Sequence, residues 1–261
     1  MKGLLKIFTK DILKLSLWFI AVSLMVFFAA KNNFFLSLGI MVCFSLVAGV
    51  YVFGTEKETN SLIFTESLPA TKKQIWLAKT AVIITFTIIL ILLLNYIKPS
   101  YKNLYFKMPP YIENGVNIEL KSEIIYIITS MLVFSSALSY CISTVMKRTL
   151  SCVLMSVLMW ILAEWTFYTM CYYGSGVYEI FESANDIHFS VSLAFRRVYD
   201  AGNDANLLHL YQSFAKQYYE QMIIAIDLAK TYFVATMIFS NLVLSLLCYY
   251  LSFKFYTERR G

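Results

Sequence analysis

The sequence predicts an all-α membrane protein that crosses the bilayer six times. Of its 261 residues, 59% are hydrophobic and 15% are charged, with a mean hydropathy of +0.65; soluble domains average about 45–50% apolar and about 25% charged residues. Six stretches with at most one charged residue reach, or nearly reach, the roughly 17–25 apolar residues that a spanning helix needs. They are apolar on every side, as in TFTIILILLLNYI (85–97), whereas the strands of a membrane barrel alternate.

The first fourteen residues, 1–14, are predicted to form an amphipathic helix at the membrane surface. Lysines recur at every fourth position, opposite an apolar arc; the lysines are Lys2, Lys6, Lys10 and Lys14, and the apolar residues are Leu4, Leu5, Phe8, Ile12 and Leu15. Such a helix lies in the interface with its lysines at the anionic inner leaflet. The alternative, a charged flank to the first span, stays open.

The chain is expected to form a single membrane domain, 1–261. The six predicted spans cover residues 15–30, 34–54, 80–97, 124–146, 150–173 and 231–253. The first span is short, so Lys14 and Lys31 have to extend their side chains to the two interfaces. The loop 55–79 joins the second and third spans, and a long loop, 174–230, joins the last two. We expect part of this long loop to be helical and to run into the sixth span.

The distribution of basic residues predicts that both termini lie in the cytoplasm. With that orientation the inner segments carry 13 Lys or Arg residues and the outer segments carry 9, as the positive-inside rule requires. The loop 55–79 is then an inner loop and 174–230 an outer one. The net charge of +6 reflects this orientation, so no nucleic-acid partner is expected. The sequence thus predicts a multi-pass protein of the plasma membrane, in contact with its lipids.

The inner loop carries two patterns typical of helix starts. Thr55 with Glu58, and Thr71 with Gln74, match the box in which two side chains cap each other's free backbone N–H groups. Pro69 separates the two patterns and disfavours helix at the residue before it. We expect two short helices with a break, a rigid elbow suited to docking another protein. A solvated connector with ordinary capping is the alternative.

The inner-loop sequence EKETNSLIFTESLPATKKQIWLAK (56–79) resembles a known family pattern. It is similar to the inner loop of permease subunits of ATP-binding-cassette (ABC) exporters of the type-two class. The matching positions are Glu56, Leu62, Ser67, Leu68, Pro69, Thr71, Lys72, Lys73 and Lys79, and Gln74 follows the basic pair. Asn60 and Ser61 stand where the family usually has Gly-Thr.

The resemblance implies that the inner loop is a coupling helix gripped by a cytoplasmic ABC ATPase. Two ATPase copies, each binding ATP and Mg, would serve two permease copies, with a homodimer favoured over a pair with a second permease. The chain has no phosphate-binding G-x-x-x-x-G-K-[ST] motif. We therefore expect no cofactor and no enzyme site in this chain, and ATP hydrolysis by the partner.

The length and layout of the chain resemble two groups of small permeases from Gram-positive bacteria. These are the phenol-soluble-modulin exporters and the antimicrobial-peptide immunity permeases. The resemblance implies export of amphipathic or antimicrobial-type peptides from a Gram-positive cell. Export of a drug, lipid or ion by the same scaffold stays open, as does a membrane anchor or sensor that binds an ATPase without transporting anything.

Glu164 is the one formal charge inside a predicted span. A charge deep in the bilayer costs a few kcal/mol on the most lenient scales and therefore faces protein or water. Trp160 and Tyr168 stand four positions to either side, in an aromatic stretch typical of the outer half of a span. We expect Glu164, with Trp160 and Tyr168, to line a cargo pathway. The alternative is a structural role for Glu164, in which it bonds a neighbouring span or extends its side chain outward to the interface. Both histidines, His188 and His209, lie in the outer loop, so no catalytic or metal site is expected.

Overall fold

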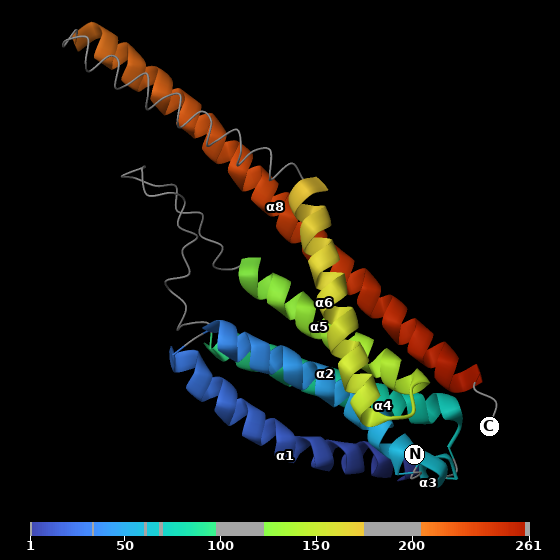
Figure 1. The fold of residues 1–261 in the computed structure, drawn as a ribbon. Coiled ribbons are helices and arrows are strands. Elements are labelled where there is room, and N and C mark those ends of the chain that lie inside the picture. The colour runs from blue at the N-terminus through green and yellow to red at the C-terminus, as the bar shows by residue number, and fades with distance from the viewer. Residues whose placement is uncertain are drawn as a thin grey trace. The chain divides into compact units, whose positions relative to one another are not determined.

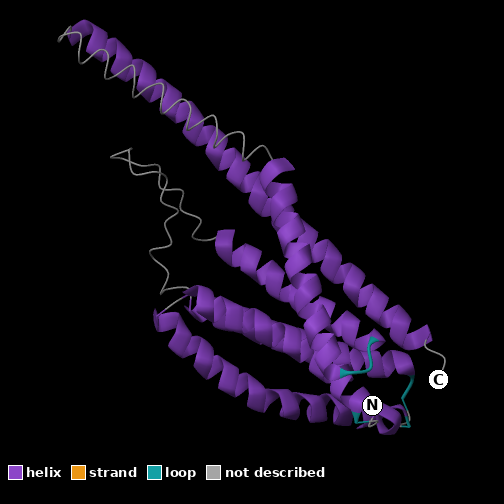
Figure 2. Ribbon diagram, viewed as in Figure 1, coloured by secondary structure: helices purple, strands orange, loops and turns teal. Residues whose placement is uncertain are grey.

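The computed structural model describes residues 2–32, 34–59, 62–67, 70–97, 123–174 and 205–258, and the regular structure in these ranges is helical (Figure 2). The helices in chain order are α1 Lys2–Asn32, α2 Phe34–Glu58, α3 Leu62–Glu66, α4 Lys72–Ile97, α5 Glu123–Val145, α6 Thr149–Gly174 and α8 Ala205–Glu258 (Figure 1). Six of these described helices contain a segment long and apolar enough to span a membrane: Ile7–Ala30, Leu36–Glu58, Lys72–Ile97, Ile125–Val145, Thr149–Cys171 and Thr231–Glu258. The prediction of an all-α, multi-pass membrane protein is confirmed.

The chain divides into two compact units. The first consists of Met1–Leu104, Leu120–Glu164 and Ile238–Gly261, and the second of Tyr105–Glu119 and Trp165–Met237. The first unit therefore contains α1 to α5, most of α6 and the last part of α8. In the second unit, the rings of Tyr168 and Phe233 meet edge to face, with centroids 6.0 Å apart and planes at 86°.

The ends of the helices differ from the predicted boundaries at both ends of the inner loop. α2 continues to Glu58 and α4 begins at Lys72, so much of the predicted loop 55–79 extends the second and third spans. α1 runs without a break through residues 14 and 15. No helix end separates residues 1–14 from the first span, so the helix itself does not mark where the membrane begins. The position of residues 1–14 at the membrane surface stays a prediction.

The capping box predicted for Thr55 and Glu58 is wrong. Thr55 lies inside α2, and its hydroxyl donates to the carbonyl oxygen of Tyr51 at 2.7 Å. Glu58 instead accepts a hydrogen bond at 3.4 Å from the backbone N–H of Thr149 in α6. A capping residue must leave the helical conformation, and Thr55 does not, because the helix before it continues.

α8 is a single helix of 54 residues, about 81 Å long at 1.5 Å per residue. Its second half forms the sixth span, and residues 205–230 of the predicted long loop continue the same helix. The position of this stretch outside the membrane stays a prediction. Most of the rest of that loop, including His188, lies outside the described residues.

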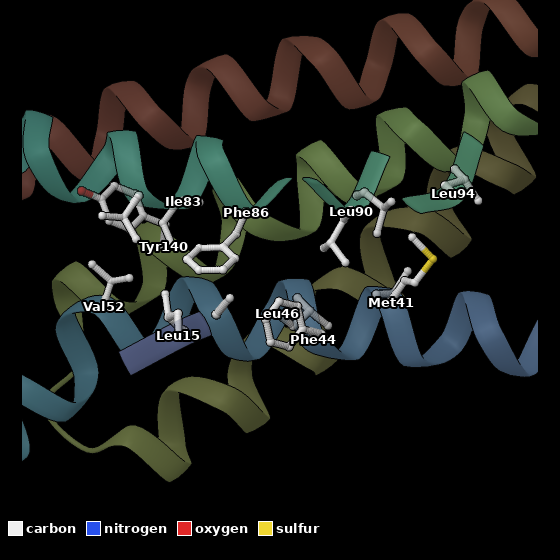
Figure 3. Close-up of a cluster of buried hydrophobic side chains, with 14 of the residues drawn as sticks. Leu15, Met41, Phe44, Leu46, Val52, Ile83, Phe86, Leu90, Leu94 and Tyr140 are labelled. Atoms are coloured by element: carbon white, nitrogen blue, oxygen red, sulfur yellow. The ribbon is translucent and has the colours of Figure 1, made fainter. Parts of the chain in front are cut away.

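The core of the first unit lies between α1, α2, α4 and α5. It contains Leu15 of α1, Met41, Phe44, Leu46 and Val52 of α2, Ile83, Phe86, Leu90 and Leu94 of α4, and Tyr140 of α5 (Figure 3). The ring of Phe19 adds aromatic contacts, with its centroid 5.7 Å from those of both Phe44 and Phe86. Large side chains outside this core are exposed, for example Leu17 and Phe28 of α1 and Leu158 and Leu162 of α6. Apolar residues exposed on a spanning helix face lipid or another protein.

α2 and α5 approach each other closely at Gly49. A Cβ atom on Gly49 would stand 2.8 Å from the Tyr140 nitrogen and 2.9 Å from the Ser136 carbonyl oxygen. α5 presents small hydroxyl side chains along this face, and the hydroxyl of Ser135 donates to that of Ser45 at 2.8 Å. Spanning helices pack tightly through such small residues, because lipid offers no hydrophobic force to join them.

Candidate functional site

A buried lysine, Lys79 of α4, joins α4 to α1 and α2. Its side chain is fully buried, and Nζ lies 2.8 Å from Glu56 Oε2 of α2 and 3.3 Å from Asp11 Oδ2 of α1. Nζ also donates to the carbonyl oxygen of Val52 at 2.7 Å. The three donors of the ammonium group each have an acceptor, and the Phe53 ring lies 4.8 Å from Nζ, within reach of a cation–π contact.

Glu56 extends this ion cluster to a fourth element. Its Oε1 lies 3.2 Å from Nζ of Lys10 in α1, and the hydroxyl of Thr65 in α3 lies 3.4 Å from both carboxylate oxygens. The cluster of Lys10, Asp11, Glu56 and Lys79 thus has two acids and two lysines. This balance makes burial tolerable, since an unpaired buried charge would cost several kcal/mol.

The next two residues of α2 contact the turn between α5 and α6. The ammonium group of Lys57 donates to three carbonyl oxygens at the end of α5: Ser143 at 2.6 Å, Thr144 at 2.6 Å and Met146 at 3.2 Å. A cation at a helix C-terminus donates to carbonyl groups that lack a helical partner. It also interacts favourably with the partial negative charge at that end of the helix dipole. Glu58 accepts from the first residue of α6, as described above. Three consecutive residues, 56–58, therefore contact five other helices.

The first turn of α4 is capped as the sequence predicts. The N–H of Thr71 donates to Oε1 of Gln74 at 3.0 Å, and the N–H of Gln74 donates to the Thr71 hydroxyl at 3.3 Å. Further along α4, the Trp76 indole N–H donates to the Ser252 hydroxyl of α8 at 3.1 Å. The Tyr140 hydroxyl of α5 donates to the Trp76 carbonyl oxygen at 3.2 Å. α4 is thus tied to α5 and α8 close to its capped start.

The predicted coupling residues fall into two groups in the structure. Glu56 belongs to the ion cluster, and Leu62 packs against the hydrophobic core. The others with described side chains lie at the surface, with Lys72 partly buried and Ser67, Thr71, Lys73 and Gln74 exposed. Leu68 and Pro69 lie outside the described residues. The two anchoring residues therefore come first along this segment, and the surface residues follow them.

Sequence reasoning missed Asp11 as a member of the ion cluster. A signal was present, because Asp11 is the only acidic residue before Glu56. It also stands four positions from both Ile7 and Leu15, on the arc of α1 that is buried. An acid on an apolar helix face needs a buried partner, and the sequence alone does not name Lys79 as that partner.

Glu164 lies in α6, outside the ion cluster, and is 7% exposed. Trp160, one turn earlier, packs against the core of the first unit. Tyr168 belongs to the second unit. The structure buries the predicted pathway acid, and a role of these three residues in transport stays a prediction.

Among the described residues, no group of three or more His, Cys, Asp or Glu side chains could hold a metal ion. Comparisons of the chain with family models, with curated proteins and with solved structures found no match. The functional interpretation therefore rests on the inner-loop pattern and on the geometry of the ion cluster.

Proposed function

We propose that this chain is the membrane permease subunit of an ATP-driven exporter of the ABC type-two class. In this proposal the inner loop docks on a separate cytoplasmic ATPase, which supplies the energy. The observation that supports it best is the ion cluster, because it closes the loop. Glu56 near the start of the loop and Lys79 at its end are 2.8 Å apart, and Thr65 ties α3 to the same carboxylate.

Closure of the loop matters for coupling because a partner's movement has to reach the membrane helices. If the loop were joined to the spans by flexible segments alone, a displacement of a few ångströms would be taken up by bond rotations in those segments and would not move the spans. Here a displacement of α3 acts on Glu56, and through it on Lys10 of α1 and Lys79 of α4. Lys57 carries the same displacement to the end of α5. In this proposal α3 moves as one unit with the helix ends that the ion cluster joins.

The surface of the loop offers a place for the partner. Glu66, Thr71, Lys73 and Gln74 are exposed, and Leu77 is 59% exposed. This mixture of charged, polar and apolar groups is typical of transient protein interfaces. We place ATPase recognition at these residues and mechanical anchoring at the ion cluster.

The proposed cargo is an amphipathic or antimicrobial-type peptide, moved out of a Gram-positive cell across the plasma membrane. A second copy of the chain completes the pathway, because six spans form half of such an exporter. Both termini lie in the cytoplasm in this arrangement, so the ion cluster is at the inner face. Export of a drug, lipid or ion would use the same loop and the same ATPase, and transport of defined cargo separates these cases.

The proposal is tested by photocrosslinking combined with transport. A photoreactive amino acid is placed at Lys73 or Glu66 in the full chain, co-expressed with a candidate ATPase from the same genome. The matched control carries it at Lys147, an exposed residue of the turn between α5 and α6. We expect the two loop positions to crosslink to the ATPase more strongly than the control does, with ATP changing the yield.

Transport is measured as ATP-dependent uptake of a labelled amphipathic peptide into inverted vesicles. We expect the double variant Lys73→Glu, Glu66→Lys to reduce uptake to the level without ATP, at unchanged protein yield and thermal stability. Crosslinking without uptake or peptide-stimulated ATP hydrolysis would show an anchor instead of an exporter. Uptake that is unchanged in the double variant would refute docking at this surface.

A further inference from the structure

A second cluster of polar side chains lies in the membrane-spanning part of the first unit. It shares no residue with the ion cluster. It consists of Glu164 of α6, Asn241 of α8 and Ser130 of α5, which are 7%, 0% and 3% exposed. Glu164 is fifteen residues beyond Thr149, about 22 Å along α6 at 1.5 Å per residue. In a hydrocarbon core about 30 Å thick, this position is past the midplane.

Hydrogen bonds hold the Asn241 amide in one orientation. Its Nδ2 donates to the Ser130 hydroxyl at 3.1 Å, and that hydroxyl donates its own proton to the Ile127 carbonyl oxygen at 2.7 Å. Because Ser130 has one proton and has used it, the amide must face Ser130 with its nitrogen. Oδ1 of Asn241 is then the free atom of the amide, and the Asn241 side chain lies close enough to act on the Glu164 carboxyl group.

Three acceptor oxygens remain without a donor at this place. Both carboxyl oxygens of Glu164 and Oδ1 of Asn241 are buried and have no hydrogen-bond partner within the described part of the chain. The indole N–H of Trp160, one helical turn before Glu164, is also buried without a partner there. Buried polar atoms without a partner are unusual, since buried polar groups are nearly always paired.

No charged residue on the same spans compensates an ionised Glu164. α6 carries no other charge, residues 231–253 of α8 carry none, and the only charged residue of α5 is Glu123 at its start. Within the described part of the chain, no ion pair includes Glu164. A bare carboxylate in such a place loses its hydration without replacement, which is far more costly than burial of the neutral acid.

We propose that Glu164 and Asn241 bind a proton between them within the membrane. Glu164 carries the proton as a carboxylic acid and donates it in a hydrogen bond to Oδ1 of Asn241. This hydrogen bond gives a partner both to Oδ1 of Asn241 and to the carboxyl oxygen that carries the proton. The bound proton thereby joins α6 to α8 through a hydrogen bond, which we call the latched state. The bond from Asn241 to Ser130 extends this link to α5. This inference goes beyond the proposed function and holds whether or not the chain exports peptides.

Release of the proton has a defined physical consequence. The carboxylate would need water or a cationic group in place of the proton. Loss of the proton therefore loosens α6 from α8, and the charge state of Glu164 controls the contact between the two helices. Glu164→Gln keeps a neutral group with both a donor and an acceptor, so it imitates the latched state permanently.

Infrared spectroscopy of the purified full chain in lipid nanodiscs tests the proposal directly. At neutral pH the wild type should show the carbonyl stretch of a protonated carboxylic acid, and Glu164→Gln should lose it. The control Glu258→Gln, which removes an exposed acid of α8, should retain the band. Asn241→Leu should shift the band to higher frequency because the acid loses its acceptor.

Thermal unfolding from mildly acidic to alkaline pH provides the second measurement. The wild type should lose stability progressively above the ordinary pKa of a glutamate until the folded protein has released the proton, because the unfolded chain gives up this proton first. Glu164→Gln should lose less over the same range, with Glu258→Gln following the wild type. An ionised Glu164 at neutral pH, seen as a carboxylate band that disappears in Glu164→Gln, overturns the proposal. A metal cation in place of the proton would also overturn it. That result would be seen as stabilisation of the wild type by Na⁺ or K⁺ at constant ionic strength, with no such effect on Glu164→Gln.

Discussion

Replacement of Lys79 by methionine is the most direct test of the ion cluster. Methionine has a similar length and is apolar, so the variant removes the charge while most of the volume is retained. Among the described residues, Asp11 and Glu56 then keep Lys10 as their one counter-charge in the ion cluster. The side chain of Lys10 is 45% exposed, so solvent weakens its attraction for both acids.

The size of the effect follows from burial. Removal of one partner from a buried ion pair costs about 3–5 kcal/mol, because the remaining charge stays buried without compensation. Lys79 is completely buried and has two carboxylate partners, so we expect Lys79→Met to lie in the upper part of that range. Lys10→Met should cost about 0–1 kcal/mol, as for a pair at the surface. Lys73→Met, at an exposed position of the same helix, should stay within about 0.5 kcal/mol.

The assay is denaturant or thermal unfolding of the purified chain in a mild detergent, with helix content as a check of folding. A rescue variant separates charge from packing: Lys79→Met combined with Asp11→Asn and Glu56→Gln leaves no net buried charge and should regain most of the lost free energy of unfolding. If Lys79→Met is as stable as Lys73→Met, or if the neutralised triple variant is less stable than Lys79→Met alone, the buried ion cluster is not a structural anchor.

Two further variants test the contacts of α2. Gly49→Ala should lower the free energy of unfolding by about 1–3 kcal/mol through overpacking, since its Cβ would stand 2.9 Å from the Ser136 carbonyl oxygen. Gly39→Ala, which has open space at its Cβ, is the control and should stabilise the protein by up to about 1 kcal/mol. Equal shifts of the unfolding temperature in the two variants would contradict the close approach of α2 and α5. Lys57→Met should cost about 1–3 kcal/mol, because carbonyl oxygens at the end of α5 lose their donor; hydrogen exchange should rise in that last turn, and unchanged protection there would argue against the cap.

Local signals account for what the sequence predicts correctly. A spanning helix satisfies its own backbone and needs only a sufficient length of apolar side chains, so six spans are visible without any knowledge of packing. The cap formed by Thr71 and Gln74 is also local, because both partners lie within one turn. In each case the decisive residues are neighbours in the chain.

The same reasoning explains where prediction from sequence stops. Thr55 and Glu58 have the same spacing as Thr71 and Gln74, yet the helix continues through them, and Glu58 finds its partner 91 residues away at Thr149. Whether such a pattern starts a helix depends on competing partners that the local sequence does not contain.

The sequence by itself determined the class of protein, the number of spans and the polar composition of the inner loop. Only the tertiary structure decided which charges meet. Asp11 and Lys79 are 68 positions apart, and their ion pair exists because α1 packs against both α2 and α4 and both residues are buried there. A charge far from water is stable only beside its counter-charge, so the placement of helices, and not any local pattern, made these four residues one cluster.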